Sequence, residues 1–293
     1  MGLRTTISER QRRLGSELKH LRELAGLSAG EGAERIGMSR AQLSHIELGR
    51  TTILTERLLN LCHVYGCTDK PYIDELVSMS EASGKGWWTA HKKRRGLDAL
   101  NTAELESDCT ALRMHQSLFI PGLLQTTEYT RAIFSSPGLG FERKEGAVEF
   151  RMQRQQVLTR QAPPAVHAVI HESALHMQFG GTKVAREQLL HLVELARLPH
   201  VTIQVYPFSA PAYAALSGNF VHVIPRLPEL GTVVLEKPVG LQYLGDRASL
   251  ERYDKLFCHL AENALPPIDV SLAPDAHSVK DSLALIQHVL YTL

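Results

Sequence analysis

The apolar residues at the start of the chain recur every three or four positions, which is the spacing of one helix face. Leu14, Leu18 and Leu21 predict a first helix over residues 11–25 that ends before Gly26. Similar spacing predicts four more helices, over residues 28–37, 39–49, 55–66 and 71–82. We therefore expect the amino-terminal region to be an all-α domain of five helices.

Two of these helices carry the capping signature, in which a serine is followed three residues later by glutamate or glutamine. Ser28 precedes Glu31, and Ser39 precedes Gln42. Gly37 supplies a flexible turn between the two helices. Two short helices joined by a tight glycine turn are typical of a helix-turn-helix motif.

The second helix of this motif, here named the recognition helix, has one apolar edge. Leu43 and Ile46 lie three residues apart and are expected to face inward. The opposite side needs no packing partner, because its side chains are small or able to form hydrogen bonds. These side chains belong to Arg40, Ala41, Ser44 and His45. Such a face can enter a groove of DNA.

Residues 13–66, centred on GLSAGEGAERIGMSRAQLSHIELGR, resemble the Xre/lambda-repressor-like DNA-binding family. The resemblance implies that the recognition helix lies in the major groove and touches base edges with its first residues. It implies that base edges are met by Arg40, Ala41, Ser44 and His45. It also implies that Gln42 and Arg50 lie near phosphate, and we include Ser39 in this expected DNA-binding set.

The same resemblance predicts one ion pair, and the sequence differs from the family pattern at two positions. Arg22 and Glu47 match a pair that joins the first helix to the recognition helix in some members. Ala29 stands where the family often has a DNA-contacting glutamine, and Gly32 stands where it has a core leucine. Glycine costs a helix about half a kcal/mol or more. We therefore expect the second helix to be soft.

The length and composition indicate a two-domain globular protein. The chain has 293 residues, of which 44% are hydrophobic. No apolar run approaches 18 residues, and MGLRTTISER lacks the apolar core of a signal peptide. We expect a cytoplasmic protein without a membrane segment.

The net charge of +1 is unevenly distributed. Residues 1–70 carry 11 Lys and Arg against 8 Asp and Glu, and residues 71–95 carry 5 against 3. The remaining residues carry 16 against 20. Basic side chains are thus concentrated in the amino-terminal part, where attraction to phosphate would be needed. An ordinary solvated surface would account for this modest excess equally well.

The segment 80–86 is rich in glycine and serine and indicates a linker. We expect a DNA-binding domain at 1–82, a linker with a basic stretch at 83–96, and a regulatory and assembly domain at 97–293. Two tryptophans and the run HKKRR follow the glycines. Either this run is an arm that contacts phosphate, or the tryptophans anchor the next domain and the charges are simply solvated.

A second resemblance appears beyond the linker, and with it the match covers nearly the whole chain. The blocks LESDCTALRMHQSLFIPGLLQTTEYTRAI, RMQRQQVLTR, VHAVIHESALHMQFGG and HVTIQVYPF resemble the second domain of actinomycete WhiJ-type regulators, which are antitoxin-like. The resemblance implies a repressor-type transcriptional regulator. It also implies a small partner protein, encoded by a neighbouring gene, that binds the regulator.

Short stretches rich in β-branched residues predict strands in this second domain. They lie at residues 166–171, 201–206, 220–224 and 232–236. Helical spacing predicts helices at 125–134, 142–160, 184–197, 247–264 and 278–293. The last three strands follow one another without a full helix between them, which suggests an antiparallel part of one sheet. We expect an α+β protein whose second domain is mixed, with a small, mostly antiparallel sheet.

The sequence offers few candidates for catalysis. No phosphate-binding glycine loop, nucleophile elbow or paired carboxylates occur, so we expect no enzyme and no cofactor. The histidines at 167, 171 and 176, with Glu172, leave a metal-dependent enzyme as a third alternative, because His167 and His171 would share a strand face. The resemblance instead places Glu172 and Leu175 at a strand-to-helix junction. The four cysteines form no CxxC pair and are expected to be reduced core residues without zinc.

One helix-turn-helix covers a single half-site, so we expect a homodimer on a palindromic operator in double-stranded DNA. Self-association is expected mainly beyond residue 96. An alternative to control by a partner protein is a small-molecule effector bound in the carboxy-terminal domain, with the 80–86 segment as a hinge.

Overall fold

The computed structural model describes residues 6–136, 144–210, 218–237, 240–271 and 280–293. The chain forms two compact units, an amino-terminal unit of residues 1–105 and a carboxy-terminal unit of residues 106–293. The division falls within one helix, α6 (Leu97–Ser107). The amino-terminal unit is helical and the carboxy-terminal unit is mixed, which confirms the predicted fold class.

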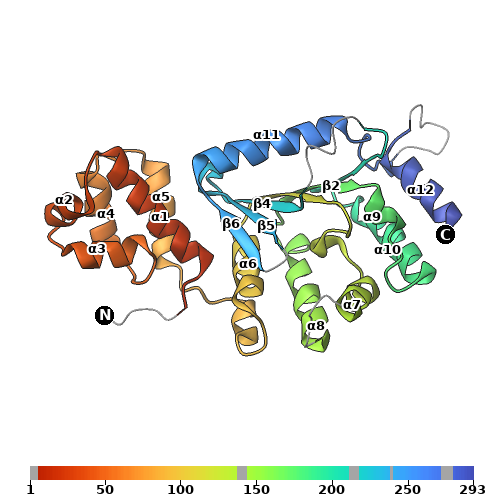
Figure 1. The fold of residues 1–293 in the computed structure, drawn as a ribbon, viewed down its shortest axis with the longest axis horizontal. Coiled ribbons are helices and arrows are strands. Elements are labelled where there is room, and N and C mark those ends of the chain that lie inside the picture. The colour runs from red at the N-terminus through yellow and green to blue at the C-terminus, as the bar shows by residue number, and fades with distance from the viewer. Residues whose placement is uncertain (1–5, 137–143, 211–217, 238–239, 272–279) are drawn as a thin grey trace. The chain divides into compact units, whose positions relative to one another are not determined.

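Five α-helices form the helix-turn-helix part of the amino-terminal unit (Figure 1). They are α1 (Glu9–Leu24), α2 (Ala29–Arg35), α3 (Arg40–Glu47), α4 (Thr55–Val64) and α5 (Lys70–Glu81). All five predicted helices are confirmed, and α3 is the recognition helix. A short 3-10 helix, η1 (Trp87–His91), follows α5 within the predicted linker.

Side-chain caps begin several of these helices. The predicted capping box before α2 is present, with Ser28 N donating to Glu31 Oε2 at 2.8 Å and Glu31 N donating to Ser28 Oγ at 3.3 Å. An equivalent box of Ser8 and Gln11 begins α1 two residues earlier than the apolar spacing indicated. No side chain caps α4, and Thr55, whose residue type suits a cap, is instead the first helical residue.

The core of the amino-terminal unit consists of the residues whose spacing predicted it. Its buried leucines include Leu14, Leu18, Leu21, Leu43, Leu58, Leu61 and Leu76. Ala25, which is the C-cap residue of α1, lies outside this core and is exposed. A buried carboxylate joins two helices, since Glu17 of α1 accepts hydrogen bonds from Arg13 and from Tyr72 of α5.

The carboxy-terminal unit is built on one six-stranded sheet with the order β3-β2-β1-β4-β5-β6. The strands are β1 (Ala111–Gln116), β2 (Ala165–His171), β3 (Val201–Tyr206), β4 (Phe220–Ile224), β5 (Thr232–Glu236) and β6 (Leu241–Leu244). β1, β2 and β3 pair in parallel, while β1–β4, β4–β5 and β5–β6 pair in antiparallel fashion. The sheet is mixed, with antiparallel pairs in the majority, as predicted.

Two strands and one neighbour relation were not predicted correctly. β1 was missed because ALRMHQ carries long polar side chains instead of the β-branched residues that mark a strand. β6 was missed because it is only four residues long. The expected run of three antiparallel strands is wrong for β3, which lies at the edge of the sheet and pairs only with β2 among the described strands.

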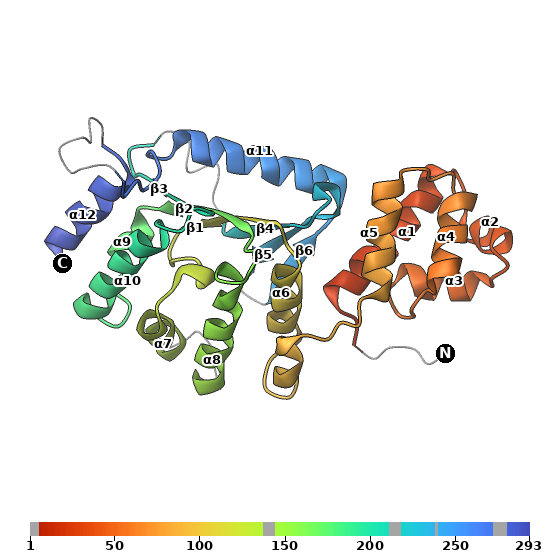
Figure 2. The same ribbon diagram turned by 180° about the vertical axis from the view of Figure 1, so that it is seen from behind.

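Helices cover both faces of this sheet. They are α7 (Thr127–Ser135), α8 (Lys144–Gln155), α9 (Ser173–His176), α10 (Thr182–Leu195), α11 (Arg247–Asn263) and α12 (Ser282–Thr292). In both views α11 runs along one face, and α7, α8 and α10 lie on the other (Figures 1 and 2). The predicted helix starts at 142 and 278 lie outside the described residues. No helix in the described ranges is long and apolar enough to cross a membrane.

The cysteines differ in their environments. Cys62 and Cys109 are free thiols in the core, as expected, and burial raises their pKa values to about 11 and about 12. Cys67 is half-buried and Cys258 is exposed on α11, so the prediction of core positions is wrong for these two. The spacing of α11 leaves position 258 on its outer side, away from Phe257 and Leu260 in the core.

Histidines lie on the sheet face that α11 covers. His115 is fully buried, and its Nδ1 atom lies 2.9 Å from the carbonyl oxygen of Val169. His222 is also buried, and neither of its ring nitrogens has a hydrogen-bond partner among the described residues. The charged groups near it are Arg113 and Asp254, which form an ion pair with each other. Burial lowers the pKa of both histidines to about 4.

We expect the carboxy-terminal unit to lose stability as the pH falls from about 6.5 to about 4. In that interval the unfolded chain binds protons on His115 and His222, whereas the folded chain does not. The loss is on the order of 3 kcal/mol for each histidine. Urea unfolding followed by circular dichroism across this interval measures it.

A His222→Leu variant separates this titration from general acid effects. At pH 7 it should unfold at the same urea concentration as the parent chain or a higher one, because the ring nitrogens lose no hydrogen bond. Below pH 6 it should lose less stability than the parent. If the two proteins lost equal stability at acid pH, the attribution of part of this loss to His222 would be wrong.

Candidate nucleic-acid interface

The recognition helix α3 begins at a complete capping box. Ser39 N donates to Gln42 Oε1 at 2.9 Å, and Gln42 N donates to Ser39 Oγ at 3.2 Å, as predicted. Leu43 is fully buried and Ile46 is 7% exposed, so the predicted apolar edge does face inward. The cap fixes where the helix starts, and the two apolar residues fix which side it turns outward.

The predicted DNA-contacting residues differ in how accessible they are. Those that are exposed are Ser39, Arg40, Ala41, Gln42 and Arg50. Ser44 and His45 are half-buried, and the Nδ1 atom of His45 is buried without a hydrogen-bond partner in the described part of the chain. The first turn of α3 is therefore the most open part of the helix. This is the part of a recognition helix that meets base edges.

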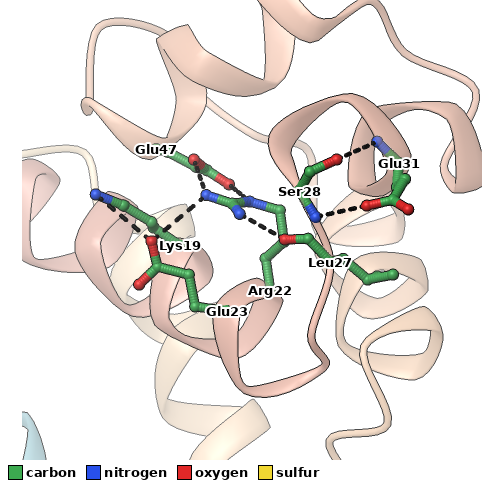
Figure 3. Close-up of polar contacts among 7 residues, drawn as sticks. All are labelled: Lys19, Arg22, Glu23, Leu27, Ser28, Glu31 and Glu47. Carbon is green, nitrogen blue, oxygen red and sulfur yellow. Dashed lines mark hydrogen bonds and ion pairs between the residues drawn. The ribbon is translucent and has the colours of Figure 1, made fainter.

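A buried ion pair joins α1 to the end of α3, as Figure 3 shows. Arg22 Nε lies 2.7 Å from Glu47 Oε1, and Arg22 Nη2 lies 3.0 Å from Glu47 Oε2. Both side chains are only 7% exposed. Arg22 Nη1 also donates to the carbonyl oxygen of Leu27 at 2.8 Å. The predicted ion pair is confirmed, and its two-pronged geometry fixes direction as well as distance.

The electrostatics of this pair follow from the same contacts. The hydrogen bonds that Arg22 donates to the Glu47 carboxylate raise the pKa of Arg22 above its usual value, so the guanidinium stays charged although it is buried. Because the same guanidinium reaches Leu27, it joins three segments: α1, the turn before α2, and the last residue of α3. The orientation of the recognition helix thus depends on a contact made 25 residues away in sequence.

Gly32 has a packing role that its sequence position did not reveal. A β-carbon at Gly32 would lie 2.7 Å from Arg22 Cδ and 2.8 Å from Tyr65 Oη. The absence of a side chain therefore makes room for the arginine of the ion pair and for the tyrosine ring. Gly32 is buried, so the expected softness of α2 is offset by close packing.

Two further glycines bring α1 and α3 together, and neither was singled out from the sequence as a packing residue. A β-carbon at Gly15 would lie 2.7 Å from the carbonyl oxygen of Ile46 and closer still to that of Glu47. One at Gly49 would lie 2.8 Å from the carbonyl oxygen of Gln11, and Gly49 has φ +69°. A glycine inside a helix that otherwise has apolar spacing was the available signal.

The end of α3 fixes the backbone of the next basic residue. Gly49 N donates to the carbonyl oxygen of Ile46 at 2.9 Å, and Arg50 N donates to that of His45 at 2.8 Å. Arg50 is exposed. Its main chain is therefore held at a constant position relative to the helix, while its side chain is open to solvent.

The basic stretch after the predicted linker lies on and just beyond η1. Trp88 is 8% exposed, Trp87 is half-buried, and the two rings meet edge to face at 6.1 Å. Lys92, Lys93 and Arg94 are exposed. These positions are compatible with an arm that contacts phosphate and equally with solvated charges, so both interpretations remain.

Two known protein families match the chain, one over its amino-terminal residues and one over its carboxy-terminal residues. Residues 13–75 match a helix-turn-helix domain, which supports an Xre-like, DNA-binding regulator. Residues 100–271, more than half of the chain, match the domain of unknown function DUF5753. The chain belongs to the DUF5753 family. No curated protein and no solved structure matches it.

The candidate metal-binding histidines, His167 and His171, each form a hydrogen bond with a neighbouring side chain. His167 Nε2 lies 2.6 Å from Gln204 Oε1, and His171 Nδ1 lies 2.6 Å from Ser173 Oγ. Glu172 precedes α9 at the predicted strand-to-helix junction, and its Oε2 accepts a hydrogen bond from Phe208 N at 2.7 Å. Over the described ranges no three His, Cys, Asp or Glu side chains are grouped to hold a metal ion. The metal-enzyme alternative gains no support from this region.

Proposed function

We propose that this DUF5753 protein is a sequence-specific transcriptional regulator of the repressor type, whose recognition helix reads the major groove. The observation that carries the proposal is the capped, exposed first turn of α3, held by the buried Arg22–Glu47 pair. A short helix oriented in this way can enter the groove as a rigid body. Selection from a random duplex library, followed by genome-wide mapping of bound sites, tests the proposal. Recovery of no enriched sequence would overturn it.

Each residue of the expected DNA-binding set has a proposed role. Arg40 donates two hydrogen bonds to guanine, and the methyl group of Ala41 meets thymine. Ser44 and His45 contact the neighbouring base edges. Phosphates are contacted by Ser39, Gln42 and Arg50. The oxygen of the Gln42 amide already serves the cap, so its nitrogen is the donor that remains for phosphate.

Arg40→Ala and Arg50→Ala should have different effects on binding. Arg40→Ala should weaken operator binding by about 1 to 3 kcal/mol and relax the preference at one base pair. Arg50→Ala should weaken operator and random DNA alike and reduce the salt dependence of binding. Fluorescence anisotropy on operator and scrambled duplexes at several salt concentrations measures both effects. Identical behaviour of the two variants would contradict the proposed division of roles.

We propose that the protein binds a palindromic operator as a homodimer, because one helix-turn-helix contacts only one half-site. Self-association would lie mainly beyond residue 96, so that the two recognition helices can adopt half-site spacing. Light scattering of the full chain, free and on DNA, tests this. A monomer in both states would refute it.

Control of this regulator is proposed to come from a small protein encoded by a neighbouring gene, which binds the DUF5753 domain in an antitoxin-like arrangement. The support is the resemblance of the sequence blocks in residues 105–208 to WhiJ-type regulators. Pull-down of the full chain with the neighbouring gene product tests this. Absence of binding, together with no change in operator affinity, would count against it.

A further inference from the structure

The amino-terminal unit contains a cleft to which the recognition helix contributes no lining residue. Its volume is about 320 Å³, which lies at the lower end of the range for small-molecule sites, roughly 300 to 1,000 Å³. All of its lining residues belong to this one unit, namely to the start of α1, the segment after α5, and the first half of α6. The cleft is thus a property of the unit itself.

The lining of the cleft combines an apolar wall with positive charge. Trp88 and Leu100, both nearly buried, supply apolar surface. Lys92 and Arg95 supply two cationic groups. The carboxylate on the lining, Glu104, already faces a guanidinium, because its Oε1 atom lies 3.4 Å from Arg10 Nε. Cationic side chains outnumber carboxylates among the lining residues, and the apolar wall favours a ring.

We propose that this cleft binds a small aromatic anion, with its ring against Trp88 and its acidic group toward Lys92 and Arg95. A carboxylate or a sulfonate would meet this description. A charged ligand group in contact with lysine and arginine forms strong, charge-assisted hydrogen bonds.

The cleft also lies next to a contact that supports the recognition helix. Ser8 and Gln11 line it and form the capping box of α1, with Ser8 N donating to Gln11 Oε1 at 3.1 Å. The carbonyl oxygen of Gln11 lies so close to Gly49 that a β-carbon there would be 2.8 Å away. Gly49 directly precedes Arg50. A ligand that disturbs this first turn of α1 therefore acts on the end of α3.

Occupancy of the cleft should lower the affinity for DNA, a consequence that rests on the proposed function. An anion held by Lys92 and Arg95 cancels positive charge that would otherwise attract phosphate. Displacement of the first turn of α1 acts in the same direction, since it loosens the support of Gly49 and Arg50. Ligand binding itself does not depend on DNA and can be measured alone.

The binding test uses the full chain and anilinonaphthalene sulfonate, an aromatic anion that is fluorescent. The two tryptophans are Trp87 and Trp88, so emission of the probe excited through tryptophan reports binding near the cleft. We expect saturable binding that Lys92→Gln weakens about tenfold. The control is Lys85→Gln, which removes an exposed lysine that does not line the cleft and should leave the affinity unchanged.

Phenylnaphthylamine, the neutral counterpart of the probe, separates charge recognition from apolar adsorption. It should bind about tenfold more weakly than the sulfonate. Equal binding of the two compounds, equal effects of Lys92→Gln and Lys85→Gln, or no saturable binding of the sulfonate would each overturn the proposed site.

The coupling test adds the sulfonate to the protein on a fluorescein-labelled duplex at constant salt. We expect affinity to fall about threefold or more, and Lys92→Gln to abolish this effect of the probe. Probe binding without any change in DNA affinity would overturn the coupling. Failure to bind DNA with or without the probe would instead refute the proposed function and leave the ligand site standing.

Discussion

Replacement of Glu47 by alanine is expected to lower the free energy of unfolding of the amino-terminal unit by about 3 to 5 kcal/mol. The Arg22 guanidinium would remain buried after losing the carboxylate that accepts two of its hydrogen bonds. Whole domains are stable by only about 5 to 15 kcal/mol, so the variant would be close to unfolded. Both tryptophans belong to this unit, and urea unfolding followed by tryptophan fluorescence therefore reports on it.

Glu23→Ala is the matched control for this experiment. Glu23 Oε1 lies 3.8 Å from Arg22 Nη2, but its side chain is 53% exposed. Removal of this exposed carboxylate should cost less than about 1 kcal/mol. Similar losses in Glu47→Ala and Glu23→Ala would show that burial does not govern the strength of the pair.

A double variant, Arg22→Met with Glu47→Leu, separates stability from orientation. Exchange of a buried pair for apolar residues of similar volume is often neutral or stabilising. We expect stability close to that of the parent chain and weaker operator binding, because the directional contact that positions α3 is gone. Operator affinity equal to that of the parent would show that the pair does not orient the recognition helix.

Gly15→Ala is expected to destabilise the amino-terminal unit by about 2 kcal/mol or more, although alanine is the better helix former. The added methyl group would lie within 2.7 Å of the Ile46 carbonyl oxygen and nearer to that of Glu47. Both are main-chain atoms, so no side-chain rotation can relieve the overlap. The recognition helix must move away from α1 instead, and operator affinity should fall along with stability.

Gly30→Ala is expected to have the opposite effect on the stability of the amino-terminal unit. Gly30 is an exposed residue of α2, and a β-carbon there would lie 3.8 Å from its nearest neighbour, Ser28 Oγ. This substitution should raise stability by up to about 1 kcal/mol, because the unfolded chain loses conformational freedom and nothing is displaced. If Gly15→Ala also stabilised the protein, the close approach of α1 to α3 would be disproved.

The fold of the amino-terminal unit was largely predictable because its signals are local. Ser39 with Gln42, and Ser28 with Glu31, form caps between residues three apart, and such contacts follow from spacing alone. The apolar residues of α3 are likewise three apart. The local signal is ambiguous at Thr55, which suits a cap by residue type but is the first helical residue of α4.

Most helices and strands of the carboxy-terminal unit could be predicted from the sequence, but the order of the strands in the sheet could not. Strands rich in valine and isoleucine were found, whereas β1 was missed because its polar side chains Arg113 and His115 find partners far along the chain. Those partners, Asp254 and the carbonyl oxygen of Val169, are brought to β1 only by the assembled sheet and by α11. A strand in the centre of a sheet can carry such residues only when the fold supplies their partners.

The sequence by itself determined where helices start, which faces are apolar, and which residues the recognition helix turns outward, because these properties depend on residues within one or two turns. Only the tertiary structure decided the order of the strands, the glycines at which α1 and α3 touch, and how deeply Ser44 and His45 are covered. These depend on contacts between residues distant in sequence, and no local spacing encodes them. Arg22 and Glu47 belong to both groups, since a family resemblance suggested the pair and the packed helices bury it.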